Sequence, residues 1–319
     1  MHTNRHFCCQ IAEMSAQMKA FIAYKFNDGF NQIDDTLLKD WEAVEPTDTQ
    51  WKEIGLKPHP TLFADEVQSG LFASRVSHNE QAITVSIIER ILPSATIKRH
   101  LTQLRDDFEQ QHGQKVTKQQ MAEWKEQYVN ATLPDCPLKE TLIEVSFDYK
   151  NRVMLVGTSS QKNADTVVSW LVQEVFTDKS LQPTIWRPHN VGKWLNNYLE
   201  NDTLLNASAK LFNMETEEKS SFANDVGCQT AQRLFKEKGN MRVSELGLRI
   251  DDYCAFTLTD KAVVKGIKYA ISAEQEMELN EAKGESATRY HLTNQTLMVA
   301  ARRQILEVFK EMENEPDEL

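Results

Sequence analysis

The chain has 319 residues, 40% of them apolar, and a formal net charge of −11 at pH 7. Such a length can bury the core of one large domain or of two to three ordinary domains. No apolar run reaches the roughly 18 residues of a membrane span, and the first ten residues lack the apolar centre of a secretory signal. Taken alone, the acidic balance also argues against a nucleic-acid partner.

Cysteine usage is typical of a reducing compartment. The five cysteines are few, odd in number and without a C-x-x-C pair: Cys8, Cys9, Cys136, Cys228 and Cys254. This pattern supports neither a disulfide framework nor a zinc site. We therefore expect a cytoplasmic protein without a bound metal or cofactor.

The first part of the chain mixes strands, turns and one short helix. Residues 1–17 show no periodicity, and we expect them to be a disordered upstream extension that contributes little to fold or binding. The elements expected next are a strand at 19–26, a helix at 34–41, turns at 45–48 and 57–60, and extended segments near 61–67 and 71–77.

The clearest local signal is a strand that runs into a helix. An apolar strand at 82–90 must stop at Pro93, which lacks a backbone donor but suits a first helical turn. Ser94 is an alternative N-cap. Gly113 can take the left-handed conformation that ends a helix, and Thr117 opens a Thr-Lys-Gln-Gln capping box. These signals predict two consecutive helices packed as an antiparallel hairpin.

Basic residues recur at seven-residue spacing on the polar faces of these helices. Antiparallel packing would bring five of them into one neighbourhood: Lys98, Arg99, Arg105, Lys118 and Lys125. By periodicity alone, the solvated flank of an ordinary strand-to-helix junction explains them better. Acids in the same region could also cancel their charge. We interpret the five as candidate phosphate contacts, to be weighed against that simpler explanation.

The second half of the chain is regular on both sides of a weak region at 201–240. The elements expected there are strands at 143–149 and 152–156, a helix at 164–175, an antiparallel meander at 241–250, 253–259 and 263–269, an acidic helix at 273–283, and a closing helix with Leu297, Ala301, Ile305 and Val308 on one face. Trp186, Trp194 and Tyr198 are expected core or interface aromatics, and a stacking platform for bases is the less favoured alternative. The mixture predicts an α+β fold of antiparallel sheets with packed helices.

Charge is distributed unevenly along the chain. Residues 28–66 carry ten acids and three lysines, and residues 307–319 carry six acids and one lysine. Residues 228–268 instead hold eight Lys and Arg against five acids. An acidic protein can still present a basic surface, because the local potential governs the encounter with a partner.

Several of these segments, in this order, resemble the RdgC family of recombination-associated proteins. The resemblance rests on Ile-Leu-Pro-Ser-Ala-Thr-Ile-Lys at 91–98 and on a second helix that ends in Leu133-Pro134 before a strand hairpin. It extends to the opening strand at 19–25, to the strand and helix at 153–166, and to the closing helix at 292–309. The matching pieces cover most of residues 18–319.

The resemblance implies a function that composition does not show. It implies a ring- or horseshoe-shaped homodimer that passes duplex DNA through a basic hole, binds it without reading its sequence, and limits access of the recombinase RecA. Such a protein would be cytoplasmic and associated with the nucleoid. The region 201–240 would be a protruding tip. Further DNA contacts would be Lys139, Gln232, Arg233, Lys236 and Lys238, and the dimer gate would include Leu138 and Lys139.

Two positions depart from the family pattern. After Leu133-Pro134 the family has an arginine-rich stretch with a phenylalanine, whereas this chain has residues 135–140, in which Leu138 is the only apolar candidate for the packing role. Lys139 can replace an arginine there as a point charge. At the tip, residues 230–233 lack the family's lysine pair. Both departures fall at ring-closing contacts, so we expect a gate that opens readily.

Two other functions stay open on the sequence. A metal-dependent nuclease would need clustered carboxylates, and the acidic doublets that resemble this are Asp34-Asp35, Asp106-Asp107 and Asp251-Asp252. Adjacent residues do not project together from a helix, so we predict that these doublets are ordinary surface. No H-E-x-x-H, G-x-S-x-G or P-loop motif occurs. The second alternative is an acidic, DNA-mimicking factor that binds proteins.

Overall fold

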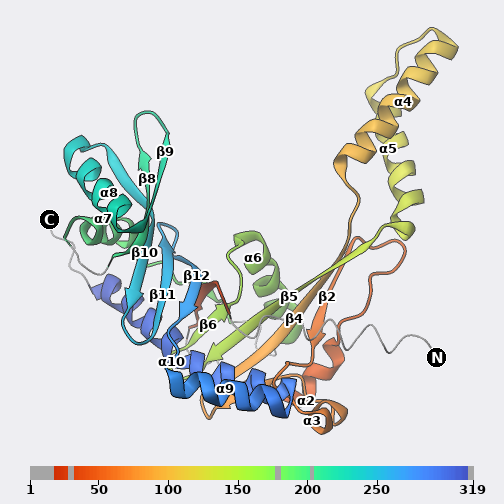
Figure 1. Cartoon of the computed structure of the whole chain (residues 1–319). Helices are drawn as coiled ribbons and strands as arrows, with labels where there is room; N and C mark the ends of the chain where they lie inside the picture. Colours follow the sequence, from red (N-terminus) through yellow and green to blue (C-terminus); the bar gives the residue numbers. More distant parts are fainter. Residues whose placement is uncertain (1–17, 28–31, 177–180, 202–204, 315–319) are drawn as a thin grey trace. The chain divides into compact units, whose positions relative to one another are not determined.

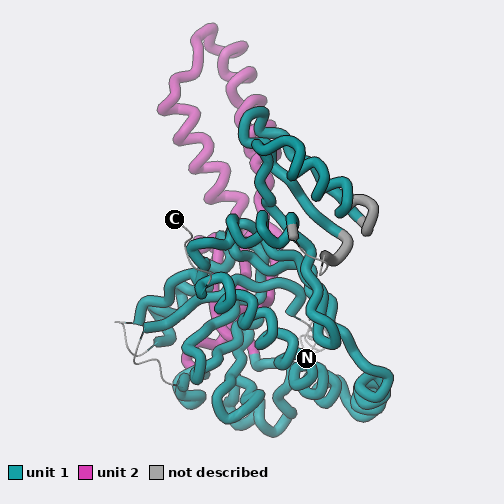
Figure 2. The backbone as a smooth tube through the Cα atoms, turned by 90° about the vertical axis from the view of Figure 1, so that its left-hand side faces the viewer, with its two compact units in different colours: residues 1–39, 58–84, 144–319 teal, residues 40–57, 85–143 magenta. Residues whose placement is uncertain are grey.

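A computed structural model describes residues 18–27, 32–176, 181–201 and 205–314. The extension expected at 1–17 lies outside this part of the chain. None of the helices in the described part has both the length and the apolar character needed to cross a membrane. The chain divides into unit 1, made of Met1–Lys39, Pro58–Thr84 and Glu144–Leu319, and unit 2, made of Asp40–Lys57 and Val85–Ile143 (Figure 2).

Unit 1 is built on an antiparallel sheet, as the alternating patterns predict. Its central order is β6-β1-β12-β11-β10-β8-β9 (Figure 1). The expected meander is confirmed, since β11 pairs with both β10 and β12 in antiparallel register. The strands are β1 (Phe21–Lys25), β3 (Ser74–Ser77), β6 (Val153–Val156), β7 (Thr184–Ile185), β8 (Leu205–Asn213), β9 (Lys219–Ala223), β10 (Met241–Ile250), β11 (Cys254–Thr259) and β12 (Val263–Tyr269).

The helices of unit 1 bury apolar residues against this sheet. The closing helix α10 covers 28 residues, and its predicted stripe is correct at Ala301 and Ile305, which join Phe309 in the buried core. The acidic helix α9 packs on α10. The helical elements are α2 (Asp35–Leu38), α3 (Ala64–Gln68), α6 (Gln161–Trp170), η3 (Leu171–Val175), α7 (Val191–Asn201), α8 (Asn224–Lys238), α9 (Ala273–Glu285) and α10 (Ala287–Asn314).

One expectation about local structure was wrong. The segment near 61–67 is not extended, because α3 begins within it. The backbone N–H of Phe63 donates to the Glu66 carboxylate at 2.7 Å, and this contact stabilises the first helical turn. The region 201–240, for which the sequence pattern predicts no element bounds, contains β8, β9 and α8. Its pattern is weak because few side chains, among them Ala209, Leu211 and Ala231, reach the core.

Unit 2 consists of strand ends and a helical hairpin. It contains η1 (from Lys39 to Trp41, at its boundary), β2 (Lys52–Lys57), α4 (Ser94–His112), α5 (Lys118–Thr132) and η2 (Leu133–Asp135). The long strands β4 (Glu80–Arg90) and β5 (Leu138–Asp148) run from one unit into the other. Within unit 2 their ends form a sheet in the order β2-β4-β5. The sequence patterns had missed β2, which is only partly buried.

Candidate nucleic-acid interface

The hairpin of α4 and α5 forms from the local signals that predicted it. Pro93 is the N-cap of α4, in an extended conformation, and Ser94 is the first helical residue. Gly113 has a φ of 62° and ends α4, a conformation that favours glycine because it has no Cβ. The Thr117 side chain accepts from the backbone N–H of Gln120, and the Gln120 side chain caps back onto Thr117. The two helices therefore begin and end where the sequence specifies.

Aromatic side chains join the two helices. The rings of His100 and Tyr128 stack with centroids 3.9 Å apart, and Phe108 meets Trp124 edge to face at 5.6 Å. Leu101 is the one buried residue of α4. A seam this narrow leaves most of each helix surface in water, where long basic side chains can reach a partner.

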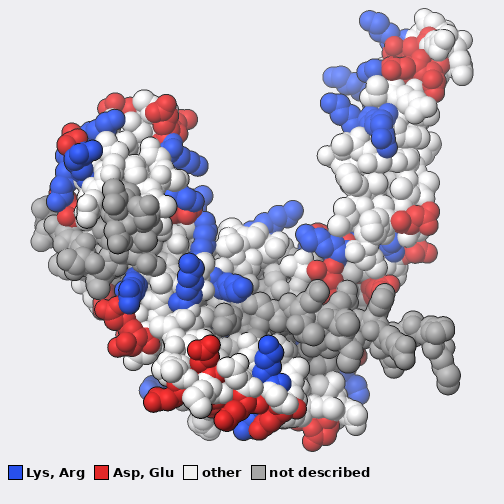
Figure 3. All heavy atoms as spheres, viewed as in Figure 1, with Lys and Arg blue, Asp and Glu red and all other residues white. Residues whose placement is uncertain are grey.

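The structure brings the two predicted basic helices together but spreads their cations along the hairpin. The ring pairs show that the chains run antiparallel, so Lys98 and Arg99 lie towards the hairpin base. Lys118 begins α5 at the opposite end. Lys98 and Arg105 are about 10 Å apart along the axis at 1.5 Å per residue. Figure 3 shows Lys and Arg side chains along one side of the hairpin and a group of Asp and Glu beside them near its tip.

Acidic neighbours cancel part of this charge. The Arg105 guanidinium donates to the Asp106 carboxylate at 2.7 Å, so this arginine is neutralised on its own helix. Lys98 and Arg99 line a surface hollow on α4 together with Asp106 and Asp107. Among the described residues, four of the five predicted cations have no ion pair: Lys98, Arg99, Lys118 and Lys125. The hairpin therefore keeps a set of free positive charges at helical spacing.

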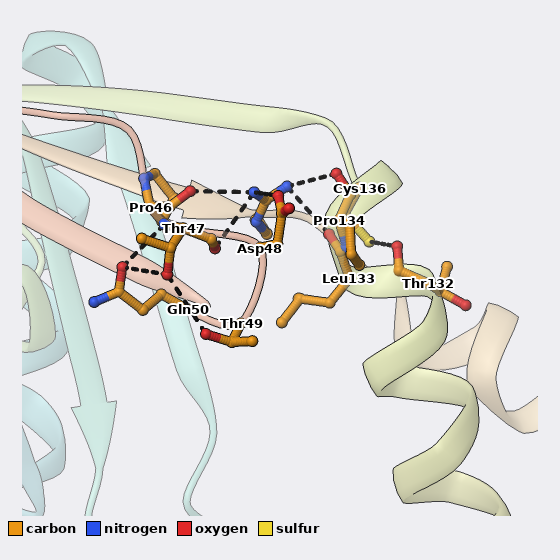
Figure 4. Close-up of polar contacts among 10 residues, drawn as sticks. Pro46, Thr47, Asp48, Thr49, Gln50, Thr132, Leu133, Pro134 and Cys136 are labelled. Atoms are coloured by element: carbon orange, nitrogen blue, oxygen red, sulfur yellow. Dashed lines mark hydrogen bonds and ion pairs between the residues drawn. The ribbon is translucent and has the colours of Figure 1, made fainter.

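Arg90, at the end of β4, holds the hairpin base together. Its side chain is 7% exposed. One terminal nitrogen donates to the carbonyl oxygens of Leu133 and Pro134, at 3.1 and 2.8 Å. The other donates to the carbonyls of Pro46 and Thr47, at 3.1 and 3.5 Å. Figure 4 shows these contacts converging between the 46–50 and 132–136 segments.

The predicted gate residues follow directly after this junction. Leu138, the first residue of β5, is 38% exposed. Lys139 lies 3.7 Å from Glu89, and both side chains are about half exposed. A pair this exposed is weakly held, so Lys139 is able to exchange Glu89 for another anion.

The predicted contacts in unit 1 lie on α8. Arg233 is exposed and lies 4.0 Å from Glu237, at the limit of an ion pair. Lys236 and Lys238 are exposed in the last turn and have no ion pair among the described residues. Gln232 is half-buried. Cations at a helix C-terminus also stabilise the helix dipole, which is the simpler explanation of the two lysines.

The sheet of unit 1 carries a basic strip whose individual residues the sequence patterns did not predict. Lys210 on β8 and Lys265 on β12 contact the Glu245 carboxylate on β10, at 2.9 and 3.1 Å. Partial burial opposes ionisation of Glu245, but these hydrogen bonds from both lysines hold its pKa below the usual range. Because two lysines contact one carboxylate, this group of three side chains keeps a net positive charge. The surplus of basic residues at 228–268 was the available signal, and Figure 3 shows Lys and Arg over β10 to β12.

The acidic doublets have structural partners. Asp34 caps α2 by accepting from Thr36, and Asp35 accepts from the backbone of Ala73 at 3.2 Å. Asp106 and Asp251 pair with neighbouring arginines. In the described ranges, no three His, Cys, Asp or Glu side chains lie close enough together to hold a metal ion.

Comparisons with known proteins agree with the resemblance in the sequence. Residues 62–314 match a family model described as "Putative exonuclease, RdgC". Three similar proteins carry the name recombination-associated protein RdgC. The protein of Pseudomonas putida (strain GB-1) is 23% identical over 66% of this chain and 70% of its own length. The protein of Pseudomonas syringae pv. syringae (strain B728a) is 24% identical over 70% of this chain and 78% of its own length. The protein of Xylella fastidiosa (strain 9a5c) is 22% identical over 63% of this chain and 68% of its own length. Because the family model covers most of its residues, the chain belongs to the RdgC family.

Proposed function

We propose that this protein binds double-stranded DNA without sequence preference and modulates homologous recombination by limiting the access of RecA to the duplex. The observation that carries the proposal is the set of four cations on the hairpin without an ion pair among the described residues: Lys98, Arg99, Lys118 and Lys125. The name of the relatives, recombination-associated protein, supports the process.

The chemistry of the hairpin suits phosphates better than bases. Phosphate contacts position a protein on DNA, whereas base-edge contacts read the sequence. The free side chains are three lysines and one arginine: Lys98 and Arg99 are neighbours on α4, and Lys118 and Lys125 lie about 10 Å apart along α5. A strip of this kind follows a charged backbone and needs no register with the bases. Occupation of the duplex would be enough to exclude another protein, without any bond being broken.

We further propose a homodimer that closes around the duplex. A cyclic dimer with a hole needs two separate contact regions, each related to itself by the two-fold axis. Leu138 and Lys139 would form the weaker region with the segment around Gln232 and Arg233, because small polar contacts open readily. In this proposal the protein works in the cytoplasm, on the nucleoid.

A metal-dependent exonuclease is the second candidate, and one observation favours it: the description of the matching family model. An end-labelled duplex of mixed sequence, incubated with the protein and Mg²⁺ or Mn²⁺, separates the two candidates. A lasting mobility shift with full-length label supports the binding protein. Shortening of the label with metal, and not with chelator, supports the nuclease. If no shift occurs even at low salt, the acidic DNA-mimicking factor is the better account.

A further inference from the structure

A groove in unit 1, remote in sequence from the hairpin, has a composition that phosphate binding does not explain. It has a volume of about 410 Å³, within the range of small-ligand sites. Leu248 and Phe256 lie at its floor and are buried, and Trp194 and Tyr198 of α7 form one side. Glu307 and Glu311 of α10 also line it.

The two aromatic rings are stacked and only partly buried. Their centroids are 4.5 Å apart and their planes differ by 26°. Each ring packs against the core of unit 1 while it lines the groove. Stacking covers one face of each ring, so a ligand can contact only a remaining face or edge. A planar group is the best match for such a surface.

The charge of the lining is acidic. Asp251 pairs with Arg249 at 3.0 Å, and Glu307 pairs with Lys310 at 2.7 Å, so these two carboxylates are neutralised. Glu311 is exposed and has no ion-pair partner among the described residues. The groove therefore combines an aromatic wall with one uncompensated negative charge, and it favours a cation.

Two other occupants fit this lining less well. Single-stranded bases stack on aromatic rings, but their phosphates would meet the Glu311 carboxylate at close range. The chain's own residues 315–319 follow α10 and carry three acids, so their charge has the same sign as the lining. A planar cation satisfies both the rings and the carboxylate. Arginine is the side chain with these properties, since its guanidinium stacks on aromatic faces and stays charged.

We propose that this groove is a second binding site, which holds an arginine side chain presented by a peptide segment of a partner protein. The guanidinium stacks on the Trp194–Tyr198 pair and pairs with Glu311, and apolar residues beside the arginine contact Leu248 and Phe256. The site is distinct from the proposed DNA interface, and neither proposal depends on the other.

The test uses a fluorescein-labelled peptide in which the arginine has a leucine and then a glycine on each side. Fluorescence anisotropy measures its binding to the full chain. The same peptide with citrulline, a neutral analogue of arginine, is the matched ligand. We expect the citrulline peptide to bind about tenfold more weakly or worse, which corresponds to about 1.4 kcal/mol. N-acetyl-arginine methylamide, the arginine without its neighbours, should displace the peptide only at much higher concentration. Equal potency would assign the site to free arginine derivatives and overturn the peptide claim.

Variants locate the binding in the groove. Glu311→Lys should weaken binding of the arginine peptide about tenfold. Glu281→Lys, an exposed control on α9 without an ion pair among the described residues, should change affinity less than about twofold. Incorporation of 5-fluorotryptophan gives a second readout. The ¹⁹F resonance that disappears in Trp194→Phe belongs to Trp194, and in the wild-type chain it should shift when the peptide binds. No binding at millimolar peptide, equal affinity for citrulline, equal loss in both lysine variants, or displacement by oligo-dT would overturn the proposal.

Discussion

A single residue, Arg90, anchors the base of the α4–α5 hairpin. Its four carbonyl partners lie 43 or 44 residues away along the chain, in two directions. Replacement by methionine leaves these oxygens without their donor, and lysine cannot span both segments with one ammonium group. We expect Arg90→Met to lower the free energy of unfolding by about 2 kcal/mol or more, with Arg90→Lys recovering only part, in urea denaturation.

The matched control is Arg105→Met on the same unit. Arg105 is exposed and forms an ion pair with its neighbour Asp106, so its loss should change stability by no more than about 0.5 kcal/mol. Equal effects of the two substitutions would show that the Arg90 contacts do not stabilise the hairpin base.

His59 should make the stability of unit 1 depend on pH. Burial lowers the pKa of this fully buried imidazole to about 4, and its Nε2 has no hydrogen-bond partner among the described residues. Between the unfolded pKa of about 6.5 and pH 4 the unfolded state binds more protons, so stability falls as pH falls through this window. Thr61 donates to Nδ1 from its backbone, which agrees with a neutral ring.

We therefore expect the wild-type chain to lose about 2 kcal/mol more than His59→Gln between pH 7 and pH 5, measured by urea midpoints. The comparison concerns the slope with pH and not the absolute stability of the variant. Parallel slopes for the two proteins would contradict the assignment of a neutral, buried His59.

At the residue scale, short-range signals were predictable and long-range ones were not. Gly113 and Thr117 act on backbone groups within four positions, so their sequence context was enough to place both helix ends. The sequence predicts Arg90 only as the last residue of a strand, because no residue near it in the chain indicates its contacts with the carbonyls of Pro46 or Pro134. The same holds for Glu245, whose lysine partners come from two other strands.

Among the elements, α10 carries a buried ion pair that its apolar stripe does not reveal. Arg302 donates to Glu144 on β5 at 2.9 Å, and the two side chains are 5% and 14% exposed. Removal of one partner leaves the other charge buried without a counterion, which typically lowers the free energy of unfolding by about 3–5 kcal/mol. We expect a loss of that size for Arg302→Met in urea denaturation.

A double substitution distinguishes the pair from simple packing. Arg302→Met with Glu144→Gln removes both charges and should recover much of the loss. Arg289→Met, which breaks an exposed pair between the first turn of α10 and Glu285 at the end of α9, should cost less than about 1 kcal/mol. If the double variant is no more stable than Arg302→Met, the stranded charge is not the cause.

Element prediction succeeded where one face of a helix or strand is buried. The meander β10–β11–β12 and the hairpin helices have clear periods, and they were found with bounds close to those observed. β2 was missed because a partly buried strand alternates weakly, and α3 was missed because five residues are too few for a helical period. The buried polar residues of α10, including His291 and Asn294, had no signal in the apolar pattern.

For the whole molecule, the proposed gate makes a prediction about assembly. Lys139→Glu and Arg233→Glu should each weaken DNA binding several-fold, because they reverse exposed charges at the proposed contact region. The solution mass of the proposed homodimer should stay unchanged, since its other proposed interface would persist. Light scattering and anisotropy measure the two properties on the same sample. Dissociation of the dimer by Arg233→Glu would show that this assignment of the gate is wrong.

The salt dependence of DNA affinity tests the central claim most directly. Each phosphate contact contributes a slope of about −0.9 in log K against log salt concentration. Lys98→Gln with Arg99→Gln should therefore make the slope shallower by about 2 for each chain that contacts the duplex, equally for unrelated sequences. The control, Lys283→Gln on the acidic helix α9 with Arg289→Gln at the start of α10, should leave the slope unchanged. A flat slope in the wild-type protein, or equal slopes for it and the hairpin variant, would contradict binding through the hairpin cations.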